Sequence, residues 1–319
     1  MRILIIGCGS IGTRHIRNLL AMGYKDLVVY DTDKKVKEAV AARFKINACD
    51  TVTKALDETD VVMICTPADS HVPLALLALK KKNAAFIEKP LSTSMKGVEK
   101  LRKSGGKRVM VGFNVRFHPM VLAIKNLIGK MGTIYSAHME YAYFLPDARK
   151  GTYASGYAAK KGQGGGVILD HLHEIDYGIS LFGRVRSVFG SAQTISKLDI
   201  QTEDTADVVL GFQRGFTCSL HLDYLQKAYS RSVKIVTKKG IIEGNFATGI
   251  LKVTEYGKKV TTKKFQKGFN ETYKHELRHF IGCLKKRARP AIDVGEATHS
   301  LKVALAIKRS VAEEKVIAL

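Results

Sequence analysis

Two residues suited to proton transfer, Asp170 and His173, stand three apart in a stretch whose pattern predicts a helix. Apolar residues in this stretch recur at intervals of four and three and define one buried stripe: Ile168, Leu172, Ile175, Ile179 and Phe182. At about 100° per residue, Asp170, His173 and Tyr177 share the opposite face. His171 lies near the edge of the stripe. A carboxylate beside an imidazole raises its pKa and fixes its tautomer, as general acid–base catalysis requires. The alternative is a merely solvated face.

A second set of residues, Gly7, Gly9 and Gly12, has the spacing of a dinucleotide-binding turn. An apolar β-branched run leads through G-x-G-x-x-G into a helical pattern. Gly7 allows the tight turn, Gly9 lets the backbone approach a pyrophosphate, and Gly12 lets the helix pack close to the strand. The backbone N–H groups at the helix start, including those of Ser10 and Ile11, are expected to face the phosphates.

Asp31 follows the predicted strand 27–30, about 20 residues after the glycines, where a ribose-binding carboxylate is expected. A carboxylate there accepts hydrogen bonds from both ribose hydroxyls and repels a 2′-phosphate, so the sequence favours NAD over NADP. Lys34 and Lys35 lie near enough to soften that preference. Without Asp31, a glycine-rich turn of no special function would be the alternative.

Lys89 is a further candidate for proton transfer, because it follows the predicted strand 84–87. Ligands of a parallel sheet bind beyond the carboxyl ends of its strands, so this position is expected to lie near the nicotinamide. A lysine there can hold a substrate hydroxyl and help to deprotonate it. Pro90 restricts the backbone at this point. The alternative is a structural lysine paired with Glu88 or with a helix end.

The first part of the chain, residues 1–118, is predicted to be an α/β dinucleotide-binding domain. Its strands alternate with single helices, which indicates a parallel sheet with right-handed crossovers. The helices are expected at 34–44, 70–82 and 94–103, and further strands at 60–65 and 108–112. The carboxyl-end rule selects the glycine turn, Asp31, the residues Thr66 and Pro67 with His71, and the stretch 88–90.

The second part, residues 119–319, is predicted to be a separate α+β domain with a mostly antiparallel sheet. Strand-like runs follow one another directly, and several are joined by tight turns. They are expected at 134–142, 185–193, 206–212, 216–222, 232–237, 240–244 and 250–256. Two helical patterns, 271–287 and 295–314, close the chain.

Charge and composition limit the classes of partner. The 319 residues suffice for two domains with sizeable cores. Lys and Arg number 52 against 29 Asp and Glu, a net charge of +23, so a polyanionic partner has to be considered. The basic residues are scattered, and no basic helix carries interleaved aromatics. A solvated surface is therefore favoured over attraction of an anionic substrate, and nucleic acid is not expected.

The cysteines and apolar runs indicate a cytoplasmic protein. The five cysteines are an odd number without a CxxC pair, which argues against a disulfide framework or a metal site and suits a reducing compartment. The apolar run 3–6 is too short for a signal peptide. No stretch approaches the roughly 20 apolar residues of a membrane helix, so no membrane association is expected.

Candidate substrate contacts flank these motifs. Asn114, Arg116 and His118 follow the predicted strand 108–112. Tyr153 and Tyr157 lie before the helix that carries His173. Asn114, Arg116 and Tyr157 are the residues we expect to bind substrate. The guanidinium of Arg116 could bind a carboxylate or phosphate in bidentate fashion. An ion pair between domains is the alternative for this residue.

Taken together, the motifs resemble the Gfo/Idh/MocA oxidoreductases, which include glucose-fructose oxidoreductase and inositol dehydrogenases. The resemblance covers nearly the whole chain and is carried by GCGSIGTRHIRNL, CTPADSH, FIEKPLS, GFNVRFHP and GGGVILDHLHEIDY, in this order. It implies a Rossmann domain followed by a domain whose open sheet serves the active site and oligomer contacts, in homodimers or homotetramers.

The resemblance also implies roles for single residues. It implies that Lys89 and His173 act on the substrate hydroxyl with help from Asp170, and that cofactor contacts come from Thr66, Pro67, His71 and Glu88. Many members space the aspartate and histidine four apart, so the spacing of three leaves the role of Asp170 open. That spacing resembles a branch linked to sugar-acid and surface-polysaccharide gene clusters, which favours a sugar or nucleotide-sugar substrate, anionic ones included.

The leading functional hypothesis is an NAD-dependent dehydrogenase or reductase that acts on a carbohydrate-type secondary alcohol or its ketone. One variant of it keeps NAD bound and reduces a second sugar. The alternative from another class is a non-catalytic sensor or co-regulator that reports NAD and a ligand on the same fold. Such a sensor could lose its lysine, so the presence of Lys89 with His173 favours the enzyme.

Overall fold

The computed structural model describes residues 1–149, 151 and 153–319, which divide into two compact units. The first unit comprises Met1–Asn114 and Asn270–Thr298, and the second comprises Val115–Phe269 and His299–Leu319. A single boundary between residues 118 and 119 therefore does not describe this division, because the chain returns to the first unit at Asn270.

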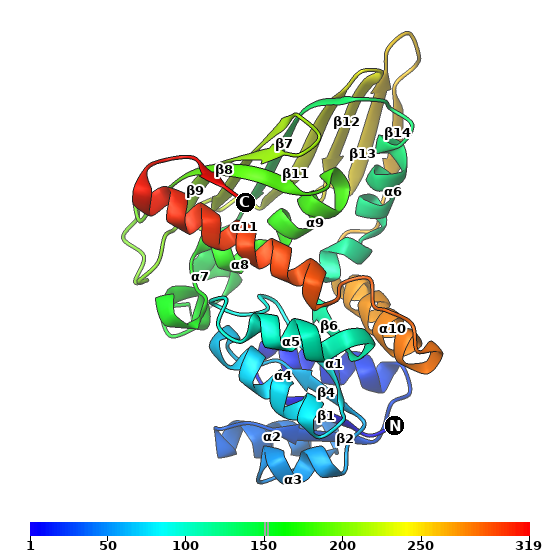
Figure 1. The fold of residues 1–319 in the computed structure, drawn as a ribbon, viewed down its shortest axis with the longest axis vertical. Coiled ribbons are helices and arrows are strands. Elements are labelled where there is room, and N and C mark those ends of the chain that lie inside the picture. Colours follow the sequence, from blue (N-terminus) through cyan, green and yellow to red (C-terminus); the bar gives the residue numbers. More distant parts are fainter. Residues whose placement is uncertain (150, 152) are drawn as a thin grey trace. The chain divides into compact units, whose positions relative to one another are not determined.

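The first unit is built on a parallel sheet with strand order β3-β2-β1-β4-β5-β6 (Figure 1). Its strands are β1 (Ile3–Ile6), β2 (Leu27–Tyr30), β3 (Asn47–Ala48), β4 (Val61–Ile64), β5 (Ala84–Glu88) and β6 (Val109–Gly112). The strands β1, β4, β5 and β6 are buried along their whole length, as expected for a parallel sheet covered on both faces. The predicted parallel sheet is confirmed.

Helices connect these strands, and one arrives from much later in the chain. They are α1 (Ser10–Ala21), α2 (Lys34–Phe44), α3 (Val52–Asp57), α4 (His71–Lys80), α5 (Val98–Gly105) and α10 (Asn270–Lys286). On α10, the Phe280 ring packs 5.6 Å from that of Phe86, and the Tyr273 ring 5.8 Å from that of His15. Both contacts join residues that lie far apart in the sequence, so local patterns could not place α10 in this unit.

The second unit is built on a sheet with strand order β14-β13-β12-β11-β7-β10-β9-β8-β15 (Figure 1). In the described part of the chain, β7 and β10 run parallel and the other neighbouring strands are antiparallel. The strands are β7 (Ile134–Ala142), β8 (Val185–Gln193), β9 (Thr205–Phe212), β10 (Thr217–Asp223), β11 (Ser230–Thr237), β12 (Gly240–Asn245), β13 (Ile250–Glu255), β14 (Thr261–Lys264) and β15 (Ile317–Ala318). The predicted mostly antiparallel sheet is confirmed.

Helices pack against one face of this sheet and leave the other open. They are α6 (Pro119–Ile128), α7 (Leu145–Ala148), α8 (Val167–Asp170), α9 (Leu172–Phe182) and α11 (Val294–Glu313), which continues from the first unit. Short 3-10 helices in the chain are η1 (Ala68–Ser70), η2 (Gly106–Arg108), η3 (Asn114–Phe117), η4 (Tyr157–Ala159) and η5 (Lys161–Gln163). On the open face, Tyr135, Phe189 and Val209 are exposed. The role of this open face in oligomer contacts stays a prediction.

Among the described residues, no helix is both long and apolar enough to cross a bilayer.

The helix predicted from the stripe is two helices, α8 and α9, separated at His171 (φ −89°, ψ 22°). The predicted stripe is buried throughout, as the period required. The opposite face is not simply solvated, however, because Asp170 is only 5% exposed and Tyr177 is fully buried. The sheet and the loops before α8 cover this face, which the sequence period alone could not show.

His221 on β10 lies between two carboxylates. Its Nδ1 is 2.8 Å from Asp207 Oδ1 on β9, and its Nε2 is 2.9 Å from Asp223 Oδ2 at the end of β10. Burial lowers the pKa of His221, but the hydrogen bonds and charges of the two carboxylates outweigh burial and raise the pKa overall. The ring of His221 therefore links β9 to β10 through its two carboxylate partners.

We expect the second unit to lose stability as the pH rises through the raised pKa of His221. An unfolded histidine titrates near about 6.5, so the stabilising contribution is complete below that pH and is lost as the pH passes the folded-state pKa. Unfolding of the wild type and of His221→Gln, followed by circular dichroism from acidic to alkaline pH, checks this. The stability difference should shrink with rising pH, and a constant difference would contradict the expectation.

Candidate active site

The glycine turn after β1 contains two glycines that the fold itself requires and one that it does not. Gly7 has φ +97°, and a Cβ there would lie 2.6 Å from the carbonyl oxygen of Cys65. A Cβ on Gly12 would clash with the carbonyl oxygen of Gly7. Gly9 has φ −67°, and a Cβ there would meet nothing within 4 Å. Neither backbone conformation nor packing requires glycine at position 9, so the open space beside it fits a ligand's close approach.

Asp31, half-buried after β2, closes the same turn. Its Oδ2 accepts the backbone N–H of Cys8 at 2.7 Å, and its Oδ1 accepts that of Asp33 at 2.9 Å. Helix α1 begins after Gly9, which has no side chain to cap it, so its first N–H groups suit an anion. The turn, the helix start and this carboxylate together fit a dinucleotide with its pyrophosphate on α1 and its ribose at Asp31.

Glu88 and His15 hold the end of β5, which precedes Lys89. The Nε2 of His15 on α1 lies 2.6 Å from Glu88 Oε1, and both side chains are buried. Glu88 Oε2 in turn accepts the backbone N–H of Lys89 at 3.2 Å. The predicted cofactor contact of Glu88 stays a prediction, and what its carboxylate does here is to link α1 to the backbone of Lys89.

His71 at the start of α4 joins two turns of the same sheet edge. Its Nδ1 lies 2.8 Å from the carbonyl oxygen of Pro90, and its Nε2 lies 2.8 Å from that of Thr66. Burial lowers the pKa of His71 despite the two carbonyl oxygens, which raise it. Both ring nitrogens face the backbone, so His71 positions the turns that hold Thr66 and Lys89. The expected part of His71 in holding the cofactor stays a prediction.

Asp170 is the centre of a cluster on the second unit. Its Oδ2 accepts the hydroxyls of Tyr143 at 3.2 Å and Tyr224 at 3.0 Å, and its Oδ1 accepts that of Tyr157. The Nη2 of Arg149 lies 3.4 Å from Asp170 Oδ2 and donates to Tyr157 Oη at 2.8 Å. We call these five residues the tyrosine cluster. The carboxylate of Asp170 therefore orients phenols and a guanidinium, and its expected role beside His173 stays a prediction.

The packing of His171 accompanies the break between α8 and α9. Its buried ring lies 4.4 Å from the ring of Tyr141, 5.2 Å from that of Tyr143 and 5.0 Å from that of Tyr224. His173, two residues on, is half-buried. Sequence spacing does not indicate these aromatic partners, because they lie in or just after β7 and just after β10, far from His171 in the chain.

Two predicted substrate contacts are engaged by the protein. Arg116 donates from Nε and Nη2 to the two carboxylate oxygens of Asp176, at 2.6 and 2.7 Å, and both residues belong to the second unit. Asp176 thus engages the guanidinium fork of Arg116 within this unit, and the predicted substrate contact of Arg116 stays a prediction. Asn114 is buried and donates to Thr272 Oγ1 at 2.6 Å, which links it to α10. Its predicted substrate contact also stays a prediction.

A buried ion pair lies beside His173. Arg231 on β11 is 4% exposed and donates to the fully buried Glu174 on α9. The guanidinium carbon of Arg231 lies 4.5 Å from the ring centre of Tyr141 and 4.7 Å from that of Phe269. Removal of either partner would leave a buried charge, which typically costs about 3–5 kcal/mol. This pair anchors the first turn of α9.

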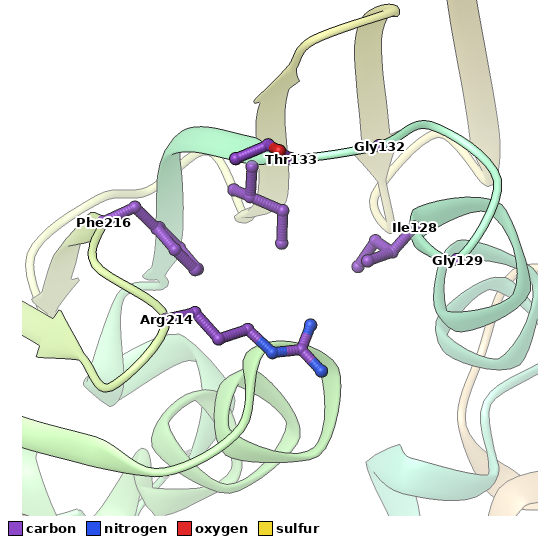
Figure 2. Close-up of a pocket in the computed structure, with 7 residues that line it drawn as sticks. Ile128, Gly129, Gly132, Thr133, Arg214 and Phe216 are labelled. Atoms are coloured by element: carbon purple, nitrogen blue, oxygen red, sulfur yellow. The ribbon is translucent and has the colours of Figure 1, made fainter.

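A separate cavity of about 370 Å³ lies at another place on the second unit (Figure 2). It is bounded by the end of α6, by the turn before β7 and by the hairpin between β9 and β10. Among the described residues that line it, Arg214 alone is charged, and this side chain is exposed. The cavity shares no residue with the tyrosine cluster and offers no set of groups for proton transfer.

We expect Gly9→Ala to weaken binding of NAD about tenfold or more without lowering the melting temperature, because the added methyl group enters only the space kept for the ligand. Gly12→Ala should instead destabilise the fold, since its methyl group meets the Gly7 carbonyl. Gly282→Ala on α10 is the matched control, because its methyl group also meets nothing within 4 Å. Titration calorimetry and thermal melts separate the three. Unchanged NAD affinity in Gly9→Ala would count against this site.

Comparison with known proteins identifies the family to which the chain belongs. The model of the oxidoreductase family with an NAD-binding Rossmann fold matches residues 1–113, and that of the C-terminal alpha/beta domain of the same family matches residues 125–319. Inositol 2-dehydrogenase of Rhizobium meliloti is 26% identical, over 100% of this chain and 99% of that protein. Myo-inositol 2-dehydrogenase of Thermotoga maritima is also 26% identical, over 100% and 98%.

Solved structures share the fold. Levoglucosan dehydrogenase in complex with NADH and levoglucosan has a TM-score of 0.90 at 19% identity, covering 100% of this chain and 99% of that one. GenD2 from gentamicin A biosynthesis in complex with NAD has a TM-score of 0.85 at 20% identity, covering 100% and 96%. With both halves of the chain matched in order, this protein belongs to the Gfo/Idh/MocA oxidoreductase family and carries its NAD-binding Rossmann fold.

Proposed function

We propose that this NAD-dependent oxidoreductase transfers hydride between the nicotinamide and a secondary alcohol of a hydroxyl-rich ring, in the class of sugars, sugar acids, inositols and nucleotide sugars. The observation that carries the proposal is the placement of Lys89 after β5, at the carboxyl edge of a sheet whose glycine turn fits the dinucleotide. Curated relatives that span the whole chain are inositol dehydrogenases.

The proposed chemistry divides between Lys89 and His173. Bound NAD would supply the hydride acceptor. The side chain of Lys89 holds the substrate hydroxyl, and His173 accepts the proton that this hydroxyl loses as the carbon becomes a ketone. The backbone of Lys89 is set by Glu88, and the turn it belongs to is set by His71 through the carbonyl of Pro90. The first turn of α9, which carries His173, is anchored by the buried pair of Glu174 and Arg231 described above.

A non-catalytic sensor of NAD and a ligand is the alternative, and it is less favoured. A sensor needs the glycine turn and Asp31 but has no use for an ordered lysine at the end of β5. The contacts of His15, Glu88 and His71 around Lys89 would then serve no purpose beyond stability. Oxidation of any sugar or inositol by the purified protein decides between the two.

We expect Lys89→Met to lower hydride transfer about 100- to 10,000-fold while NAD affinity changes little, because methionine keeps the length of the side chain and removes its hydrogen-bonding group. NADH absorbance with a panel of inositols and sugars gives the rate, and titration calorimetry gives the affinity. Lys80→Met, at an exposed lysine of α4, is the matched control. Turnover of Lys89→Met at the wild-type rate would refute the assigned role.

We expect Asp31→Asn to raise the use of NADP relative to NAD about tenfold or more, because the amide keeps an acceptor oxygen for the glycine turn and loses the charge that repels a 2′-phosphate. The ratio of kcat/KM values for the two cofactors measures this. Asp57→Asn removes the same charge from the exposed surface of α3 and should leave the ratio unchanged. A ratio that stays constant in Asp31→Asn would show that Asp31 does not face the ribose.

A further inference from the structure

Arg116, Arg149 and Arg231 are cations of the second unit that could attract an anionic substrate, yet each is paired with a carboxylate of that unit. Arg116 is paired in bidentate fashion, and Arg231 is paired in full burial. The Nη2 of Arg149 lies 3.4 Å from Asp170. Diverting any of these arginines to a ligand would leave a buried carboxylate without its compensating cation, which is unfavourable. The positive charge of these three arginines is therefore already balanced by carboxylates of the protein.

The tyrosine cluster offers hydrogen-bond acceptors and ring surfaces rather than charge. The hydroxyl protons of Tyr143, Tyr157 and Tyr224 point to Asp170. Burial, followed by the charge of Asp170, raises the pKa of Tyr143 and of Tyr224 far above the usual value, so both phenols remain protonated and donate. A phenol that donates its proton can still accept a hydrogen bond. Tyr143 and Tyr157 are only half-buried, so the hydroxyl oxygen of Tyr143 and the rings of both can meet a ligand.

The charges of Asp170 and Arg149 cancel within this cluster. Arg149 is half-buried, and its guanidinium carbon lies 4.5 Å from the ring centre of Tyr157. Burial alone would lower its pKa, but Tyr157 and Asp170 raise it, so the guanidinium stays charged beside its carboxylate. The cluster as a whole presents no net charge. A ring with several hydroxyl donors and apolar C–H faces matches it, and a carboxylate or phosphate does not.

We propose that the tyrosine cluster is the recognition surface for the substrate and selects a neutral polyol ring over a sugar acid or a nucleotide sugar, with Asp170 as the positioning residue of Tyr143 and Tyr157. The proposal rests on the proposed function, because it concerns the substrate of the same reaction. It gives Asp170 a role toward the phenols in addition to the expected one beside His173, and it narrows the substrate class to uncharged rings.

The first test compares matched substrates on the wild-type protein loaded with NAD. D-glucose and D-glucuronate, and D-galactose and D-galacturonate, differ within each pair only at C6, which carries a hydroxymethyl group in the neutral sugar and a carboxylate in the uronate. Myo-inositol serves as a further neutral ring. We expect kcat/KM to favour the neutral member of each active pair at least tenfold. Preference for a uronate would overturn the proposal while leaving the dehydrogenase function intact.

Binding provides a readout that does not need turnover. The chain contains 12 tyrosines and no tryptophan, so tyrosine fluorescence can report occupancy of the cluster. If no probe yields NADH, the proposed function fails, and the order of affinities still decides this inference. Tighter binding of the neutral probes supports it. Equal or tighter binding of the uronates, or of a nucleotide sugar, overturns it.

The second test removes the charge of Asp170. In Asp170→Asn the phenols lose one of the two acceptor oxygens and the negative charge that orients them, and Arg149 loses its compensating charge. We expect KM for the neutral probe to rise about tenfold and the uronate-to-neutral ratio of kcat/KM to rise at least tenfold, with the pH profile of kcat unchanged. A shifted pH profile with an unchanged KM would show that Asp170 acts on His173 and would overturn the positioning role.

Two further variants control this test. Asp147→Asn removes the same charge from the exposed side of α7, outside the cluster, and should change neither KM nor the ratio. If Asp170→Asn does not fold, Tyr143→Phe takes its place, because it deletes one cluster hydroxyl without any change of charge. We expect Tyr143→Phe to raise KM for neutral and acidic probes alike while kcat persists. An unchanged KM in this variant would overturn the recognition role.

Discussion

The close approach of α1 to the sheet is the constraint on which the first unit depends. Gly12 lies against the Gly7 carbonyl with no room for a side chain, and this contact sets the distance between helix and strand. One helical turn later on the same helix, His15 reaches the buried carboxylate of Glu88 on β5. Glu88 then holds the backbone of Lys89. A glycine near the N-terminus is thus linked by contacts to a lysine almost 80 residues away.

The second unit is organised by buried carboxylates that need cations. Asp170, Glu174 and Asp176 lie within two helical turns, and all are nearly or fully buried. A buried carboxylate is tolerable only when it is paired and hydrogen-bonded, so each draws an arginine from another element. These pairs tie α8 and α9 to the loop after α7, to β11 and to η3. At Asp170, the paired Arg149 offsets the charge of the carboxylate. The basic composition of the whole chain therefore says little about the charge around this residue.

Prediction from the sequence succeeded where a local period reports burial. The helix at Lys34–Phe44 and the strands at Ile134–Ala142 and Val185–Gln193 have the predicted bounds, because alternation and helical spacing are set by neighbouring residues. The short helices α3 and α6 were not predicted. The return of α10 to the first unit was missed, since it depends on rings contacting Phe86 and His15 across the chain.

The parallel sheet with its glycine turn and the mostly antiparallel second sheet followed from the sequence alone, because glycine spacing and strand alternation are local properties of the chain. The same motifs located Asp31, Lys89 and His173, whose roles stay predictions. Only the tertiary structure decided the partners of the charged side chains. In the folded chain, Arg116 pairs with Asp176, His71 lies between two backbone carbonyls, and Asp170 accepts from phenols of separate elements. Pairing of buried charges is a property of three-dimensional proximity, and sequence spacing does not contain it.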